Sequence, residues 1–122
     1  MLIRSQDKSI LLNFSNSTVV YIAKNDKDFV ISSLGNENRY RLGKYSSEAK
    51  ALKVLDMIQG AYMDFETAKI TSTGLATTAY AGNYTYDALE SIERGINVLK
   101  GYAEIIRESV VFQMPEDGSV EV

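Results

Sequence analysis

Short apolar runs separated by polar turn residues fill the first 43 positions of the chain. The runs are rich in valine, isoleucine, tyrosine and phenylalanine, which favour strands, and the asparagine, aspartate and glycine between them favour turns. The predicted strands are Leu2–Ser5, Ser9–Phe14, Thr18–Ala23, Phe29–Ser33 and Arg39–Leu42. Because the connections are short, we expect an antiparallel meander of four or five strands.

Helical spacing of apolar residues begins after residue 45 and predicts a first, shorter helix. Ser46 or Ser47 can cap its first turn, which also contains Glu48. The apolar stripe consists of Ala51, Leu55, Ile58 and Tyr62, flanked by Leu52 and Val54. We expect this helix to end near Gly60 or to extend as far as Phe65.

An uncharged stretch follows at residues 71–86, with three tyrosines, two glycines and many hydroxyl groups. We expect a loop here. It is either a solvated loop whose tyrosines pack on the core or a functional one, because long loops without structure of their own are uncommon and often functional.

A second, longer helix is predicted by an apolar seam that recurs every three or four residues. The seam consists of Leu89, Ile92, Ile96, Leu99, Ala103 and Ile106, and a second stripe consists of Val98, Tyr102 and Ile105. A helix that is apolar on more than one face is buried on more than one face. We therefore expect a second copy of the chain to cover it, as a homodimer or higher homo-oligomer. A central core helix in a monomer is the alternative.

The last apolar run, Val110–Met114, predicts a strand that returns to the sheet before Pro115. Residues 116–122 are expected to form an acidic flexible tail. The complete pattern predicts an α+β fold in one domain, residues 1–115, with an N-terminal antiparallel meander sheet wrapped around the long C-terminal helix.

Composition narrows the function, because this chain contains no histidine and no cysteine. There is no imidazole to transfer protons near neutral pH, and no thiolate to act as a nucleophile or a zinc ligand. No phosphate-binding loop motif occurs, and the carboxylates do not follow a calcium-loop spacing. We expect a binding protein with no catalytic residues, cofactor or metal.

Charge and hydropathy exclude further classes of protein. Thirteen basic and sixteen acidic residues give a net charge of −3, which does not favour a nucleic-acid polymer as partner. No apolar run approaches the roughly 20 residues of a membrane span, and the first residues turn polar too early for a signal peptide. We expect a cytoplasmic protein.

One group of residues could hold a nucleotide. Tyrosine rings stack on bases, arginine forks match phosphate oxygens, and amides or carboxylates can contact base edges or ribose. The candidate ligand-binding residues are Tyr80, Asn83, Tyr84, Glu90, Arg94, Asn97 and Arg107. The alternative is that an arginine near the end of a helix only meets the helix dipole. If the pocket lies elsewhere, Arg4, Arg41 and the sheet surface are the next candidates.

Four segments resemble small proteins encoded by phages and mobile elements of Gram-positive bacteria. They are Ile3-Arg-Ser-Gln-Asp-Lys8, Leu42-Gly-Lys-Tyr45, Val54-Leu-Asp-Met-Ile-Gln59 and Phe112-Gln-Met-Pro115. Within that group, the order of sheet, short helix and long helix resembles the first anti-Thoeris family. The resemblance does not cover residues 66–100.

That resemblance implies a sponge for a cyclic nucleotide signal. Such phage proteins bind and sequester cyclic ADP-ribose isomers in the host cytoplasm, without cleaving them, to block bacterial defence. Their pocket lies at a homodimer interface, and larger assemblies also hold cyclic oligonucleotides. Carried over, the aromatic role falls on Tyr80 and the phosphate role on Arg107. The expected amide position falls near Glu90, a carboxylate, so Asn97 is the substitute. The rival function is a phage protein–protein inhibitor or adaptor without a small-molecule ligand.

Overall fold

The computed structural model describes residues 1–16, 19–80, 93–97, 100–101, 104 and 110–122, with no account of the side chains of residues 71–80. Where the sequence predicts one domain over 1–115, the contacts group the chain into two compact units. One unit is Met1–Tyr62 with Val111–Val122, and the other is Met63–Val110. The helix α1, Glu48–Tyr80, runs through both. The candidate site described below lies entirely in the first unit.

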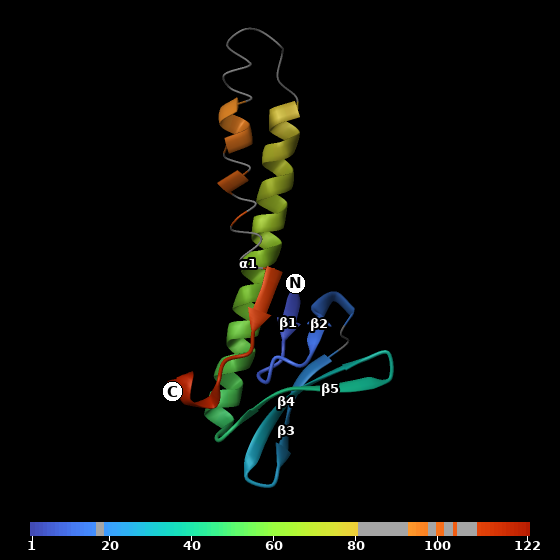
Figure 1. Cartoon of the computed structure of the whole chain (residues 1–122), viewed down its shortest axis with the longest axis vertical. Helices are drawn as coiled ribbons and strands as arrows, with labels where there is room; N and C mark the ends of the chain where they lie inside the picture. Colours follow the sequence, from blue (N-terminus) through green and yellow to red (C-terminus); the bar gives the residue numbers. More distant parts are fainter. Residues whose placement is uncertain (17–18, 81–92, 98–99, 102–103, 105–109) are drawn as a thin grey trace. The chain divides into compact units, whose positions relative to one another are not determined.

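Six strands in the described part of the chain form two three-stranded sheets (Figure 1). The first sheet has the order β2-β1-β6 and contains β1 (Leu2–Arg4), β2 (Leu11–Asn13) and β6 (Val111–Gln113). The second has the order β3-β4-β5 and contains β3 (Val19–Asn25), β4 (Asp28–Gly35) and β5 (Asn38–Tyr45). β1 pairs antiparallel with β2 and parallel with β6, and the second sheet is antiparallel throughout.

All five predicted N-terminal strands and the returning C-terminal strand are confirmed, and so is the α+β class. The single meander is wrong, because the strands divide between two sheets. A short 3-10 helix, Phe14–Asn16, turns the chain after β2, and the Asn13 side chain accepts a hydrogen bond from the Ser15 amide at 3.1 Å. β1 therefore pairs with β2 and β6 and does not join the meander.

Turns connect the strands of the meander where the sequence predicts them, and the structure shows that each has two residues. Asn36 and Glu37 both have positive φ, 47° and 69°, which is the type I′ geometry whose twist matches that of an antiparallel hairpin. Asp26, in the preceding turn, has φ of 53°. Asparagine and aspartate tolerate this left-handed region better than most residues, so the turn residues set the register of the sheet.

The helix α1 begins where the sequence predicts and continues much further. The Ser47 hydroxyl caps it by accepting a hydrogen bond from the Lys50 amide at 3.3 Å, and Glu48 lies in the first turn. The predicted end near Gly60 or Phe65 is wrong, and so is the predicted loop over residues 71–80, which are helical. Residues 61–80 contain no proline, and each residue added to a formed helix gains a backbone hydrogen bond. Weak helix formers such as threonine therefore do not stop it.

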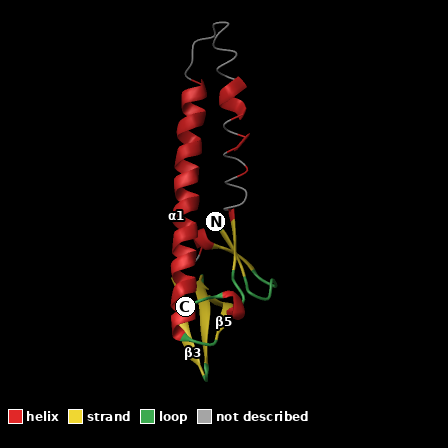
Figure 2. Cartoon of the chain, turned by 90° about the vertical axis from the view of Figure 1, so that its left-hand side faces the viewer, coloured by secondary structure: helices red, strands yellow, loops and turns green. Residues whose placement is uncertain are grey.

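The buried side of α1 contributes Ala51, Val54 and Ile58 to the core of the first unit, each at most 3% exposed. Val54 therefore belongs to the apolar stripe, while Leu52 is 50% exposed. The largest buried side chains of the sheets include Ile3, Ile31, Leu42, Tyr45 and Met114. In both overall views the meander strands lie beside the first turns of α1 (Figure 2).

The predicted long helix over residues 89–106 is described only in part. Residues 93–97 are helical, and of the nine positions in its two apolar stripes only Ile96 is described, with 45% of its surface exposed. The other eight positions, and residues 81–86 of the predicted loop, lie outside the described residues. The homo-oligomer predicted from this helix stays a prediction.

Where the sequence predicts a flexible tail over residues 116–122, the structure has a 3-10 helix, Asp117–Ser119, and a buried Val120. The Asp117 carboxylate accepts hydrogen bonds from the amide of Ser46, at 2.8 Å, and from its hydroxyl. The Lys50 ammonium donates to the Asp117 carbonyl at 2.9 Å and lies 3.4 Å from its carboxylate. Asp117 thus joins the C-terminal segment to the start of α1.

Replacing Asp117 with alanine is expected to lower the melting temperature, because the Ser46 amide loses its acceptor and Lys50 loses the nearby carboxylate, although Lys50 keeps its bond to the main-chain carbonyl. The bonds from Ser46 lower the pKa of Asp117 below its ordinary value of 3.8. This stabilisation is therefore present at neutral pH and is lost as the pH falls through the lowered pKa. Thermal denaturation should show a difference between wild type and variant at pH 7 that vanishes below that pKa. Glu116→Ala, an exposed neighbour of equal charge, is the control and should leave the melting temperature unchanged.

Candidate functional site

One face of the β3–β5 sheet brings an aromatic ring, a hydroxyl and two arginines together. Tyr21 pairs with Ser32 across β3 and β4, and Ser32 pairs with Arg41 across β4 and β5. Residues directly opposite one another share a face, and so do residues two apart along a strand. Arg39 therefore lies on the same face as Tyr21, Ser32 and Arg41.

A β-bulge interrupts the pairing of β4 with β5 immediately after Arg41. Ile31 pairs with Gly43 while Ser32 pairs with Arg41, so Leu42 is an extra residue on β5. Leu42 is buried at 1% exposure, as is Ile31 at 0%. Arg39 and Arg41 lie between the bulge and the turn, in unbroken register with β4, and that register places both on the outer face.

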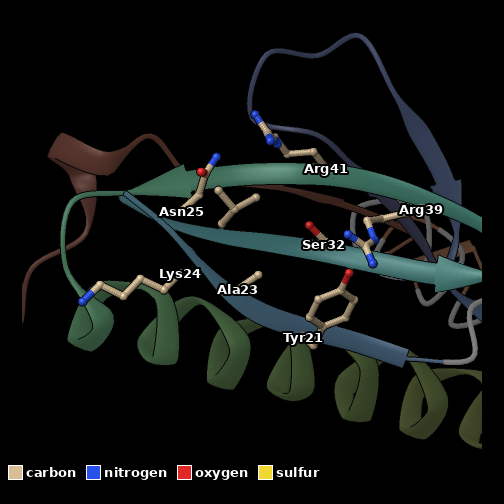
Figure 3. Close-up of a pocket in the computed structure, with 8 residues that line it drawn as sticks. Tyr21, Ala23, Lys24, Asn25, Ser32, Arg39 and Arg41 are labelled. Atoms are coloured by element: carbon tan, nitrogen blue, oxygen red, sulfur yellow. The ribbon is translucent and has the colours of Figure 1, made fainter. Parts of the chain in front are cut away.

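The face is hollowed, with a volume of about 450 Å³ (Figure 3). The lining residues are Tyr21, Ala23, Lys24, Asn25, Val30, Ser32, Arg39 and Arg41. Tyr21 and Arg39 lean toward one another in Figure 3, and the guanidinium carbon of Arg39 lies 5.9 Å from the centre of the Tyr21 ring. This is within cation–π range, so the ring and the charge hold each other in place. Arg41 also lines a neighbouring hollow with Gln6, Asp7 and Lys44.

The lining carries three cationic side chains and no carboxylate. Neither Arg39 nor Arg41 forms an ion pair with a described residue. Lys24 lies over the Phe29 ring, at 5.9 Å from its centre, and the nearby Lys44 pairs with Asp28 at 3.6 Å. On a chain with a net charge of −3, this leaves two arginines whose charge no described carboxylate balances.

The floor of the hollow contains a hydroxyl group without a described partner. Ser32 is only 5% exposed, yet its side chain makes no hydrogen bond to any described residue. A buried hydroxyl normally has a partner, because leaving it without one costs about 1–3 kcal/mol. Ser32 can donate to an acceptor that enters the hollow from solvent.

This arrangement can bind an anion and stack a planar group. A phosphate or carboxylate oxygen would meet the arginines and the Ser32 hydroxyl, and a ring would meet Tyr21. Within residues 1–16, 19–80 and the described part of the remainder, no group of three or more acidic side chains could hold a metal ion.

None of the described residues predicted from the sequence as ligand-binding lines this hollow. Tyr80 ends α1, and Arg94 and Asn97 are exposed in the helical stretch 93–97. Asn83, Tyr84, Glu90 and Arg107 lie outside the described residues, so the pocket at Tyr80 and Arg107 stays a prediction.

Of the second set of candidates, Arg41 lines the hollow, whereas Arg4 is exposed on β1 in the other sheet and does not. Sequence reasoning missed Tyr21, Ser32 and Arg39. The available signal was the spacing of Arg39 and Arg41 two residues apart in a predicted strand, which places both on one face.

No family model, curated protein or solved structure matches this chain. No helix in the described part of the chain is long and apolar enough to cross a membrane.

Proposed function

We propose that this chain binds a phosphate-bearing nucleotide on the Tyr21–Ser32–Arg41 face of the β3–β5 sheet and holds it without chemical change. The observation that carries the proposal is the pair of arginines, without described ion-pair partners, beside a tyrosine ring. Guanidinium groups bind phosphate oxygens through two parallel hydrogen bonds, which a lysine cannot do.

The ligand class follows from three features that lie together. Two arginines match a ligand with several phosphate oxygens, and the Ser32 hydroxyl supplies a further donor at the floor of the hollow. The Tyr21 ring offers a stacking surface for a base. Inorganic phosphate would use only the charges, whereas a nucleotide would use the charges and the ring.

The more specific form of the proposal is a cyclic nucleotide sponge. The sequence resembles phage proteins of the first anti-Thoeris family, which sequester cyclic ADP-ribose isomers or cyclic oligonucleotides. In this form the chain is a phage-encoded, cytoplasmic anti-defence protein that works as a homodimer or larger assembly. The exposed Ile96 on the helical stretch 93–97 supports a contact between copies.

Sequestration rather than turnover is supported by the residues that line the hollow. Among them, the side chains that could transfer a proton are those of Tyr21, Lys24 and Ser32, because arginine stays protonated in proteins. The chain has no histidine or cysteine to act as a base or nucleophile near neutral pH. A bound nucleotide is therefore expected to leave the site intact.

Native mass spectrometry tests the proposal on the full chain. The protein is incubated with cyclic ADP-ribose isomers, a cyclic dinucleotide and linear ADP-ribose. We expect at least one cyclic nucleotide to be retained on an oligomer, and heat denaturation to release it with its mass and chromatographic retention unchanged. Retention of no phosphorylated ligand would contradict nucleotide binding. A hydrolysed or rearranged product would contradict sequestration.

A further inference from the structure

One edge strand of each sheet in the first unit lines a common groove. β2 is an edge strand of its sheet, and β5 is an edge strand of the other. The groove, of about 300 Å³, is lined by residues 10–13 and Asn16 on one side and by residues 35, 36, 38 and 40 on the other. Leu11 and Tyr40 on its walls are 58% and 37% exposed.

Hydrogen-bonded and non-hydrogen-bonded pairs alternate along an antiparallel ladder, and this alternation shows which peptide groups of β5 face the groove. The two-residue turn makes Gly35 and Asn38 a hydrogen-bonded pair, so the next bonded pair is Ser33 with Tyr40. The peptide groups of Arg39 and Arg41 must then point away from β4, toward the outer edge. No described strand pairs with that edge.

Gln6 already forms hydrogen bonds to the second half of the outer edge of β5, as the backbone of an added peptide would. The Gln6 amide donates to the Leu42 carbonyl at 2.7 Å. The Gln6 side-chain carbonyl accepts from the Lys44 amide at 3.0 Å, and its NH₂ group donates to the Lys44 carbonyl at 3.3 Å. The outer edge of β5 is therefore satisfied from Leu42 to Lys44, while its first half, Asn38–Arg41, is not paired with a described strand.

We propose that an extended, acidic segment of a partner protein adds to the outer edge of β5 at Asn38–Arg41. Main-chain hydrogen bonds to Arg39 and Arg41 would supply affinity, and alternate side chains would supply specificity. In the partner segment, the side chains that lie beside Arg39 and Arg41 are acidic, because no described carboxylate of this chain balances these charges. The side chains of the partner segment on the opposite face, beside Tyr40 and Leu11, are apolar.

The charge pattern argues against a second copy as the occupant. If β5 paired antiparallel with β5 of another chain about Tyr40, Arg39 of each copy would lie opposite Arg41 of the other. Like charges directly opposite each other destabilise a strand pair. A segment in which acidic and apolar residues alternate avoids this repulsion. The inference rests on the peptide groups of β5 and on the charges of Arg39 and Arg41, and it does not depend on nucleotide binding.

Selection from a phage-displayed library of random dodecapeptides on the wild-type chain tests this docking site. We expect enriched peptides to carry Asp or Glu at alternate positions. On binding a synthetic copy, the amides of Arg39 and Arg41 should exchange at least about tenfold more slowly by NMR. The Tyr40 amide, already bonded to Ser33, should not change. Failure to enrich peptides, or binding without protection of Arg39 and Arg41, would overturn the proposal.

A charge-reversal variant is the matched control, because both arginines are exposed and their replacement leaves the backbone edge intact. Selection on Arg39→Glu with Arg41→Glu should yield basic peptides, and the acidic peptides should bind this variant at least about tenfold more weakly. Recovery of the same acidic peptides on the variant would contradict the inference. So would a concentration-dependent dimer of the wild type in which the Arg39 and Arg41 amides are protected without peptide, since a second copy would then cover the edge.

Discussion

Replacing Tyr45 with alanine is expected to destabilise the first unit by about 3–5 kcal/mol, the usual cost of deleting a buried aromatic side chain. Tyr45 is 0% exposed, and its hydroxyl donates a hydrogen bond to the Pro115 carbonyl at 2.9 Å. A Cβ at Gly43 would lie 3.0 Å from the Tyr45 hydroxyl and 3.2 Å from Met114, so the Tyr45 ring packs closely against Gly43. Urea denaturation followed by circular dichroism measures the loss.

Two controls separate the cavity from the hydrogen bond. Tyr45→Phe keeps the ring and should cost about 1 kcal/mol, the net value of one hydrogen bond. Tyr40→Ala, on the same strand but 37% exposed, should cost much less than Tyr45→Ala. A loss for Tyr45→Ala no larger than that for Tyr40→Ala would contradict the packing described for Tyr45.

Alkaline pH gives a second measurement on the same residue. Burial, and next the charges of Glu116 and Asp117, raise the pKa of Tyr45 above its ordinary value of 10.0. The folded state therefore retains this proton where the unfolded state loses it, so Tyr45 lowers stability as the pH rises above 10. Tyr45→Phe should remove that part of the alkaline decline.

Replacing Arg39 and Arg41 together with alanine is expected to weaken nucleotide binding by at least about a hundredfold. Each hydrogen-bonded contact to a charged group contributes about 1.5–3 kcal/mol, and every 1.4 kcal/mol is about tenfold in affinity. Both side chains are exposed, so the fold should be retained. Calorimetry with the nucleotide retained in mass spectrometry measures the loss, and circular dichroism checks the fold.

Two further double variants show whether the effect belongs to the sheet face. Arg4→Ala with Lys100→Ala removes the same charge at exposed positions outside the hollow and should leave binding nearly unchanged. Tyr80→Ala with Arg107→Ala tests the pocket predicted from the sequence. If that variant lost binding while Arg39→Ala with Arg41→Ala kept it, the nucleotide site would lie at Tyr80 and Arg107 instead of on the sheet.

Local signals in the sequence determined the strands, the turns and the start of α1. Three kinds of signal each act within a few residues: the short apolar runs, the left-handed tolerance of Asp26 and Asn36, and the Ser47 cap. Their physical causes are backbone sterics and hydrogen bonds between near neighbours, which the sequence displays directly. For this reason every predicted strand is present in the structure, with its bounds shifted by a few residues at most.

Only the tertiary structure decided the division into two sheets, the packing of the C-terminal segment and the composition of the candidate site. β6 pairs with β1 across more than a hundred positions of sequence, and the Asp117 carboxylate meets Ser46 across 71. Tyr21, Ser32 and Arg39 come together through the register of three paired strands. Such contacts form between residues that are far apart in the sequence. The spacing of residues along the chain does not show which of these distant residues pack together.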